Sequence, residues 1–184
     1  MSDSSIAFYR KYRPETWDAV RGQDHIVKIL KAAIKGKSIG HAYLFTGSRG
    51  TGKTSVARIF AREAGVSAND IYEMDAASNR GIDEVRALRE AVETLPLESP
   101  YKVYILDEAH MLTKEAFNAL LKTLEEPPKH VIFILATTEL GKMPETIISR
   151  CEVHTFKKAT HTMLRDMVME TADAEGAKVE SAAA

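Results

Sequence analysis

This sequence of 184 residues has very little cysteine, no long apolar stretch and almost no net charge. Cys151 is the single cysteine, so the chain cannot form an internal disulfide or a metal site built from several cysteines. No apolar run is long enough to span a bilayer, and residues 1–5 lack the features of a signal peptide, so a cytoplasmic location is expected. The net charge is −1, so nucleic-acid binding would have to come from a local patch or from an assembly.

One glycine-rich segment indicates that the chain binds a nucleoside triphosphate. An apolar stretch, residues 43–46, runs into the pattern G-x-x-x-x-G-K-T and then into a helical stretch from residue 55. The glycines let backbone N–H groups surround a polyphosphate, the lysine reaches the terminal phosphates, and the threonine hydroxyl can bind Mg²⁺. A glycine-rich turn without a ligand is the alternative, but the flanking strand and helix are the context that the motif requires. The predicted nucleotide-binding residues are Gly47, Ser48, Arg49, Gly50, Thr51, Gly52, Lys53 and Thr54.

Helix and strand patterns alternate from residue 24 onward and predict a parallel α/β sheet. Hydrophobic residues make up 45% and charged residues 28% of the chain, which is typical of a globular domain. Strands separated by helices imply right-handed crossovers, and ligands then bind at the carboxyl ends of the strands. The expected strands are 43–46, 71–74, 103–106, 131–136 and 153–156, and the expected helices are 24–35, 55–64, 82–95, 116–124, a short one from 144, and 160–174.

Two carboxylates follow the expected strand 103–106. Asp107 can hold Mg²⁺ opposite Thr54, directly or through water, and Glu108 can orient or deprotonate the attacking water. Taken alone, an acidic pair after a strand is more often a helix cap or a solvated turn. The position one strand–helix interval after a phosphate loop favours the catalytic interpretation. Residues 107–110 also spell the D-E-A-H of one helicase class, but a two-lobed helicase core does not fit in this length.

A hydroxyl and a guanidinium complete the predicted catalytic set. Thr137 and Thr138 end the expected strand 131–136, where a hydroxyl can bond the γ-phosphate or the attacking water, although threonine also simply ends strands well. Arg150 follows the short helix and is a candidate finger that neutralises transition-state charge in its own site or in a neighbour's. A solvated surface arginine is the alternative for that position.

Seven blocks of the chain match a known family. They are K-Y-R-P-E-T-W from residue 11, V-R-G-Q from 20, D-A-A-S from 75, D-E-A-H-M-L from 107, F-N-A-L-L-K-T-L-E-E-P-P from 117, A-T-T from 136 and S-R-C from 149. Together they resemble the clamp-loader ATPases of the AAA+ class, and above all the gamma/tau subunits of bacterial DNA polymerase III. The resemblance covers residues 9–158, and the block from residue 117 is its most specific part.

The resemblance implies a P-loop NTPase of AAA+ type, with a five-stranded parallel sheet flanked by helices and followed by a truncated helical lid. It implies an ATPase that joins other subunits in an open five-membered ring and loads the sliding clamp onto primer–template DNA during replication. ATP or ADP and Mg²⁺ are the implied ligands.

The same resemblance gives roles to individual residues. Lys53, Asp107 and Glu108 would serve ATP hydrolysis, with Thr54 and Asp107 holding Mg²⁺. Thr138 would be the first sensor of the nucleotide, and Arg150 would act in trans on the ATP of the adjacent subunit. The implied adenine-pocket residues are Arg13, Pro14, Val20 and Gly22.

DNA would meet such a ring through backbone phosphates. In the family, helix N-termini facing the channel contact phosphates, which requires no high net charge on any one chain. Arg80, before the helix expected from residue 82, and Lys114, before the next helix, are the candidates. Ordinary helix capping and solvation explain these residues equally well. Contacts of this kind read shape and charge, so binding would weaken steeply with salt.

Two departures from the family pattern bear on the expectations. Gamma/tau relatives usually carry a cysteine-rich zinc module before the second strand, whereas residues 64–70 bridge that gap without cysteine, so no zinc is predicted. The family also continues into a complete three-helix lid and a collar domain. We therefore expect a nucleotide-binding domain at residues 1–158 and the start of an incomplete lid at 159–184, in a chain that is either an excised fragment or naturally short.

Two other functions compete with the clamp-loading ATPase. One is an assembly module that uses nucleotide to order an interface and hydrolyses little of it alone. The intact acidic pair favours the ATPase, whereas the trans placement of Arg150 favours slow turnover by this chain alone. The other is a different AAA+ DNA-remodelling motor, for branch migration or initiation, which the block from residue 117 disfavours.

Overall fold

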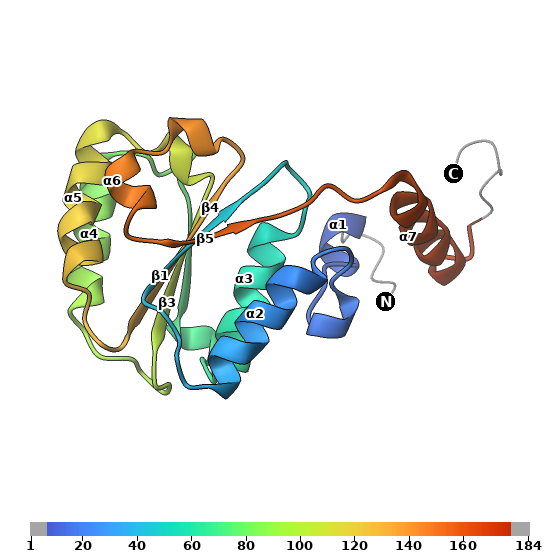
Figure 1. Ribbon diagram of the computed structural model, residues 1–184, viewed down its shortest axis with the longest axis horizontal. Helices are drawn as coiled ribbons and strands as arrows, with labels where there is room; N and C mark the ends of the chain where they lie inside the picture. The colour runs from blue at the N-terminus through green and yellow to red at the C-terminus, as the bar shows by residue number, and fades with distance from the viewer. Residues whose placement is uncertain (1–6, 178–184) are drawn as a thin grey trace.

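The computed structural model describes residues 7–177 and contains one parallel sheet with helices on both faces (Figure 1). The strand order is β2-β3-β4-β1-β5, and every neighbouring pair is parallel. The predicted five-stranded parallel architecture is therefore confirmed. The strands are β1 (Ala42–Thr46), β2 (Ile71–Asp75), β3 (Lys102–Asp107), β4 (Val131–Thr137) and β5 (Glu152–Thr155).

Helices cover the sheet in two layers, because alternate residues of each strand point to opposite faces. In β1, Tyr43 and Phe45 pack against α2 (Asp24–Lys35) and α3 (Lys53–Glu63). Leu44 faces the other side, where α4 (Ile82–Val92), α5 (Lys114–Glu125) and α6 (Glu145–Ile148) complete a second core. Figure 1 shows α2 and α3 on one side of the sheet and α4 and α5 on the other. Both faces of the central strands are thus buried, as their continuous apolar sequences require.

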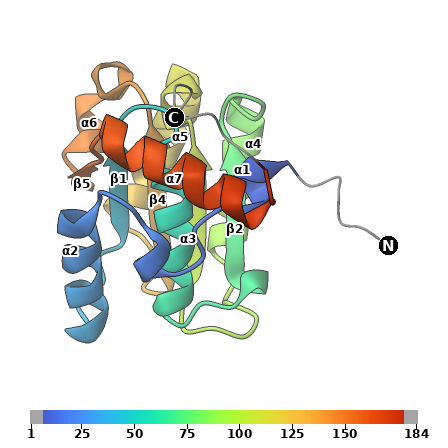
Figure 2. The same cartoon turned by 90° about the vertical axis from the view of Figure 1, so that its right-hand side faces the viewer.

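The remaining elements are short, apart from one helix at the end of the described chain. They are α1 (Phe8–Lys11), four 3₁₀ turns (Trp17–Ala19, Ala68–Asp70, Ala109–Met111 and Leu140–Lys142) and α7 (His161–Ala174). The α7 helix lies beyond β5, away from the sheet, and runs beside α1 (Figures 1 and 2). The Tyr12 hydroxyl donates to Glu175 Oε1 at 2.5 Å, and Arg21 pairs with Glu170 at 3.2 Å. The N-terminal segment therefore connects α7 to the sheet. The boundary at residue 158 between a nucleotide-binding domain and a lid remains a proposal.

Most predicted elements agree with the structure within two residues, but α4 ends earlier than expected. The helical spacing predicts a helix up to Leu95, whereas α4 ends at Val92 and the Leu95 side chain is 75% exposed. The boundary prediction was wrong because a buried contact turns the following segment toward β3. Asp70, which is fully buried, accepts hydrogen bonds from the backbone N–H groups of Leu97 at 2.7 Å and Glu98 at 2.9 Å.

Within residues 7–177, no helix combines the length and the apolar character needed to cross a membrane.

Asp70 should be a strong determinant of stability. Burial raises the pKa of its carboxyl, but the hydrogen bonds from Leu97, Glu98 and Ser99 together lower it by more, so the pKa lies below its ordinary value. An asparagine loses one of the two acceptor oxygens, so Asp70→Asn should cost about 1–3 kcal/mol of unfolding free energy in urea titrations. The exposed Asp83→Asn is the control.

The stability that Asp70 contributes should depend on pH in a defined direction. A carboxyl whose folded pKa is depressed stabilises the fold above its unfolded pKa and loses that contribution as the pH falls through the folded pKa. The stability difference between the wild-type chain and Asp70→Asn should therefore be largest near neutral pH and shrink in acid. A difference that does not change with pH would show that the charge of Asp70 is not what stabilises the turn.

Candidate functional site

The phosphate loop joins β1 to α3 at the carboxyl edge of the sheet, and its glycines have backbone shapes that other residues avoid. Gly52 has φ +91° and forms the N-cap of α3. Gly47 has φ +148°, and a Cβ there would lie 2.7 Å from the carbonyl oxygen of Phe156. Glycine is therefore required at both positions, and the loop turns back over the start of α3, whose free N–H groups suit an anion.

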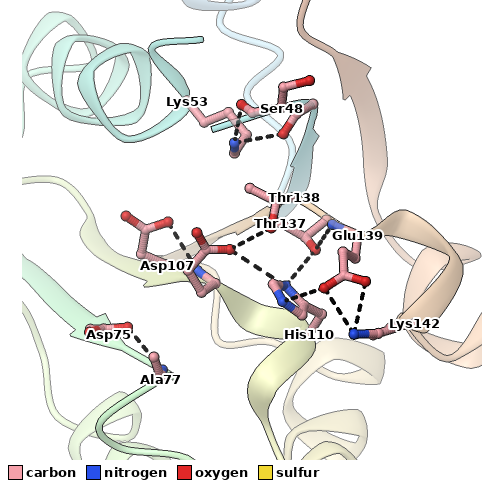
Figure 3. Close-up of polar contacts among 12 residues, drawn as sticks. Ser48, Lys53, Asp75, Ala77, Asp107, His110, Thr137, Thr138, Glu139 and Lys142 are labelled. Atoms are coloured by element: carbon pink, nitrogen blue, oxygen red, sulfur yellow. Dashed lines mark hydrogen bonds and ion pairs between the residues drawn. The ribbon is translucent and has the colours of Figure 1, made fainter. Parts of the chain in front are cut away.

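The Lys53 side chain is buried and lies across the inside of the loop. Its ammonium donates to the carbonyl oxygens of Gly47 at 2.8 Å and Ser48 at 3.0 Å (Figure 3). Burial lowers the pKa of this ammonium, whereas the carboxylates of Glu108 and Asp107 raise it by less. A polyphosphate in the loop would supply the negative charge that a buried ammonium needs.

Thr54 and Asp107 meet where a magnesium ion is expected. The Thr54 hydroxyl donates to Asp107 Oδ2 at 2.7 Å, and Asp107 Oδ1 accepts the backbone N–H of Glu108 at 2.9 Å. A hydroxyl and a carboxylate are hard oxygen ligands, and Mg²⁺ commonly uses one or two such protein groups plus phosphates and water. Over residues 7–177, no group of three His, Cys, Asp or Glu side chains could hold a metal.

Glu108 lies at the end of β3 in a backbone conformation that is rare for its residue type. Its φ and ψ are 47° and 42°, in the left-handed region. The Thr138 hydroxyl donates to Glu108 Oε2 at 2.9 Å. Thr138 is thus placed beside the acid, from which it could also reach a nucleotide. Strained conformations of this kind persist only where their surroundings hold them, and they gather at functional sites.

Arg150 is directed toward its own α5. Its guanidinium contacts Glu125 Oε1 at 2.5 Å and the Thr146 carbonyl oxygen at 2.7 Å. Across the described part of the chain, the hydrogen bonds and ion pairs of Arg150 include none with the phosphate loop or the acidic pair. The structure therefore brings together Lys53, Thr54, Asp107, Glu108 and Thr138, but not Arg150.

The residues expected near adenine lie in the N-terminal segment. Arg13 and Pro14 are half-buried after α1, and Val20 packs against the core beside α2 and α3. Gly22 has φ +72°, and a Cβ there would be 3.2 Å from the Met163 sulfur of α7. Val20 thus lies against the core of the sheet domain, and Gly22 lies against α7.

Gln23 is a connecting residue that the sequence did not single out. Its side chain is buried, donates to the carbonyl oxygen of Lys157 at 2.8 Å and accepts the Lys157 N–H at 3.1 Å. A longer contact, 3.4 Å, reaches the carbonyl oxygen of Thr51 in the phosphate loop. The only available signal was its place in the V-R-G-Q block, and nothing local indicated burial.

The candidate DNA residues Arg80 and Lys114 are both exposed, and the chain brings them close. The backbone carbonyl of Arg80 accepts the N–H of Thr113, the residue that caps α5, at 3.0 Å. At α4, however, Glu84 folds back over the N-terminus, since a Cβ on Gly81 would lie 2.6 Å from its carboxylate. An acid there competes with a phosphate for the N–H groups of α4, and Glu115 puts an acid in the first turn of α5 as well.

Comparisons with known proteins agree with this geometry. A family model described as DNA polymerase III, delta subunit, matches residues 64–160. The tau subunit of DNA polymerase III from Bacillus subtilis is 48% identical over 195 residues, which cover 95% of this chain and 35% of that protein. The Escherichia coli tau subunit is 45% identical over 163 residues, covering 77% and 25%. This chain therefore spans only about a third of these relatives or less.

Solved structures show the same fold. A DNA polymerase III gamma subunit-related protein from Thermotoga maritima superposes with a TM-score of 0.66 at 28% identity, covering 78% of this chain and 49% of that one. The Thermotoga maritima RuvB Holliday junction branch migration motor gives 0.73 at 24% identity, covering 92% and 56%. At so low an identity, the RuvB match indicates the shared AAA+ fold alone. The resemblance to gamma/tau subunits is confirmed, and the chain belongs to the DNA polymerase III delta-subunit family.

Proposed function

We propose that this chain is the ATP-binding and ATP-hydrolysing part of a cytoplasmic DNA polymerase III clamp-loader subunit. It would use ATP to load a sliding clamp onto primer–template DNA, within a ring of other clamp-loader subunits. The observation that carries the proposal is the pair of hydrogen bonds Thr54–Asp107 and Thr138–Glu108, which link the phosphate loop to β3 and β3 to β4. The names of the relatives, which are DNA polymerase III tau subunits, support a role in that polymerase.

Each side chain would have a separate task in hydrolysis. The loop N–H groups and Lys53 hold the β- and γ-phosphates, and Thr54 with Asp107 would hold Mg²⁺, which neutralises charge on those phosphates. Glu108 Oε2 accepts a hydrogen bond from Thr138, which leaves Oε1 to orient the attacking water. Arg13, Pro14, Val20 and Gly22 would line the adenine pocket.

A second function, nucleotide-dependent assembly with little hydrolysis, is favoured by the position of Arg150. Its guanidinium is bound to Glu125 and Thr146, and so is turned away from the acidic pair of its own chain. We propose that Arg150 serves a neighbour's ATP, and that a neighbour completes this site in return. The isolated chain should then bind ATP and hydrolyse it very slowly.

Lys53→Ala should weaken ATP binding. The variant loses charge-assisted hydrogen bonds of about 1.5–3 kcal/mol, so the Kd for Mg–ATP should rise about 10- to 100-fold in calorimetry. Lys35→Ala, at the exposed end of α2, is the matched control and should bind normally. Unchanged affinity of Lys53→Ala would remove the phosphate loop from the proposal.

Glu108→Gln should separate binding from hydrolysis. The amide keeps the shape and the bond from Thr138 but cannot take a proton, so phosphate release by the assembled loader should fall about 100-fold or more. The Kd of the isolated chain for Mg–ATP should stay within about two-fold, because the phosphate contacts are elsewhere. Glu63→Gln, on the exposed end of α3, is the control. Loss of ATP binding instead would mean that Glu108 is structural.

Arg150→Ala should affect only the assembly. ATP binding and slow hydrolysis by the isolated chain should not change, whereas turnover by the ring should fall about 1000-fold, as for other arginine fingers. Arg62→Ala, an exposed arginine of α3, controls for the loss of charge. Fast hydrolysis by the isolated wild-type monomer would contradict the trans assignment.

A further inference from the structure

A buried histidine lies beside the acidic pair, and no role has so far been assigned to it. His110 is in the 3₁₀ turn Ala109–Met111 that follows Glu108, and its side chain is only 6% exposed. A buried imidazole carries two polar nitrogens that need partners. Here both nitrogens face polar atoms, which come from Thr137 at the end of β4 and from Glu139, two residues further on (Figure 3).

The partners of the ring form one connected group. Nδ1 lies 3.0 Å from the Thr137 hydroxyl, and Nε2 lies 3.4 Å from Glu139 Oε1. A carboxylate can only accept, so the nitrogen facing Glu139 carries the ring proton. The Thr137 oxygen already accepts the backbone N–H of Glu139 at 3.0 Å, so its hydroxyl proton is free to bond Nδ1.

The outer end of this group is fixed by an ion pair. Lys142 lies 2.8–2.9 Å from both carboxylate oxygens of Glu139. The hydrogen bond from Lys142 is the main reason why the pKa of Glu139 lies below its ordinary value, and the charge of Lys142 adds to it. Glu139 therefore stays negatively charged beside Nε2 near neutral pH.

At the other end of this group of residues, the His110 ring lies next to Glu108. Nδ1 is 3.5 Å from Glu108 Oε2, which is a packing contact and too long for a hydrogen bond. Two adjacent threonines, the last residue of β4 and the one after it, thus hold two residues of the acidic turn: Thr138 binds Glu108, and Thr137 binds His110. Between these anchors lies the strained left-handed backbone of Glu108, which needs its surroundings to persist.

We infer that His110 is a positioning residue for ATP hydrolysis, which holds the Glu108 turn against β4 through Thr137 and Glu139. The inference rests on the proposed function, because it acts through Glu108 as the residue that orients water. Without the ring contacts, the Glu108 carboxylate could turn away from its bond with Thr138. ATP binding should be unaffected, because Lys53 and the loop do not contact the ring.

The test uses the assembled clamp loader with clamp and primer–template DNA. His110→Leu fills a similar volume without polar atoms, so kcat should fall about ten-fold while KM for ATP stays within about two-fold. His110→Asn can place its amide oxygen near the position of Nδ1, where it accepts the Thr137 hydroxyl proton, and should restore the rate to within about three-fold of wild type. His161→Leu, at the exposed start of α7, is the matched control.

Thr137→Val tests the same contact if His110→Leu does not fold, because it removes only the hydroxyl. It should slow kcat as His110→Leu does, and the double variant should be no slower than either single one. In a Glu108→Gln background, His110→Leu should add nothing further.

The outcomes separate this inference from the proposed function. If wild type hydrolyses ATP, Glu108→Gln does not, and His110→Leu and Thr137→Val keep the wild-type kcat, the positioning role is wrong and the proposed function stands. The positioning role would also be wrong if His110→Leu lowered kcat by the same factor in the wild-type and Glu108→Gln backgrounds. If the assembled wild-type loader hydrolyses no ATP, the proposed function fails and this inference fails with it.

Discussion

Parallel pairing of β1 and β3 on either side of β4 is the constraint on which the site depends. The register sets Thr46 opposite Thr137 and Leu106 opposite Leu135, so the three strands end at nearly the same level. The phosphate loop, the acidic pair and the threonine pair all begin where these strands stop. Backbone pairing also continues past the strand, since the Gly47 N–H donates to the Thr137 carbonyl at 3.2 Å. A slip in register would separate the two halves of the site.

Local sequence was enough to predict the elements and the strand ends at which the candidate site residues lie. The apolar runs of β3 and β4 fix both strands because both faces are buried, and the loop glycines follow from backbone geometry. What depends on distant contacts was not predictable. The early end of α4 depends on Asp70, and the burial of Gln23 depends on Lys157, 134 residues away. Neither contact leaves a local pattern.

In the proposed function, the site combines a phosphate-binding half with a catalytic half that a neighbouring subunit would complete. The loop, Lys53 and the Thr54–Asp107 pair are held by the sheet and by the start of α3, which suits a fixed phosphate site. Glu108 is held in a strained backbone by Thr138, whereas Arg150 is bound to Glu125 on α5. This arrangement supports tight control of hydrolysis by a neighbouring subunit, because the charge that stabilises the transition state would arrive only on assembly.

The central claim is that residues 47–54, 107 and 108 hold a nucleotide together with its metal ion. Hydrogen–deuterium exchange of the chain, with and without Mg–ATP, tests it directly because loop N–H groups that bind phosphate exchange slowly. The account predicts that Mg–ATP slows exchange in peptides covering the phosphate loop and the end of β3, while β2 changes little. Exchange in the loop that does not respond to Mg–ATP would contradict it.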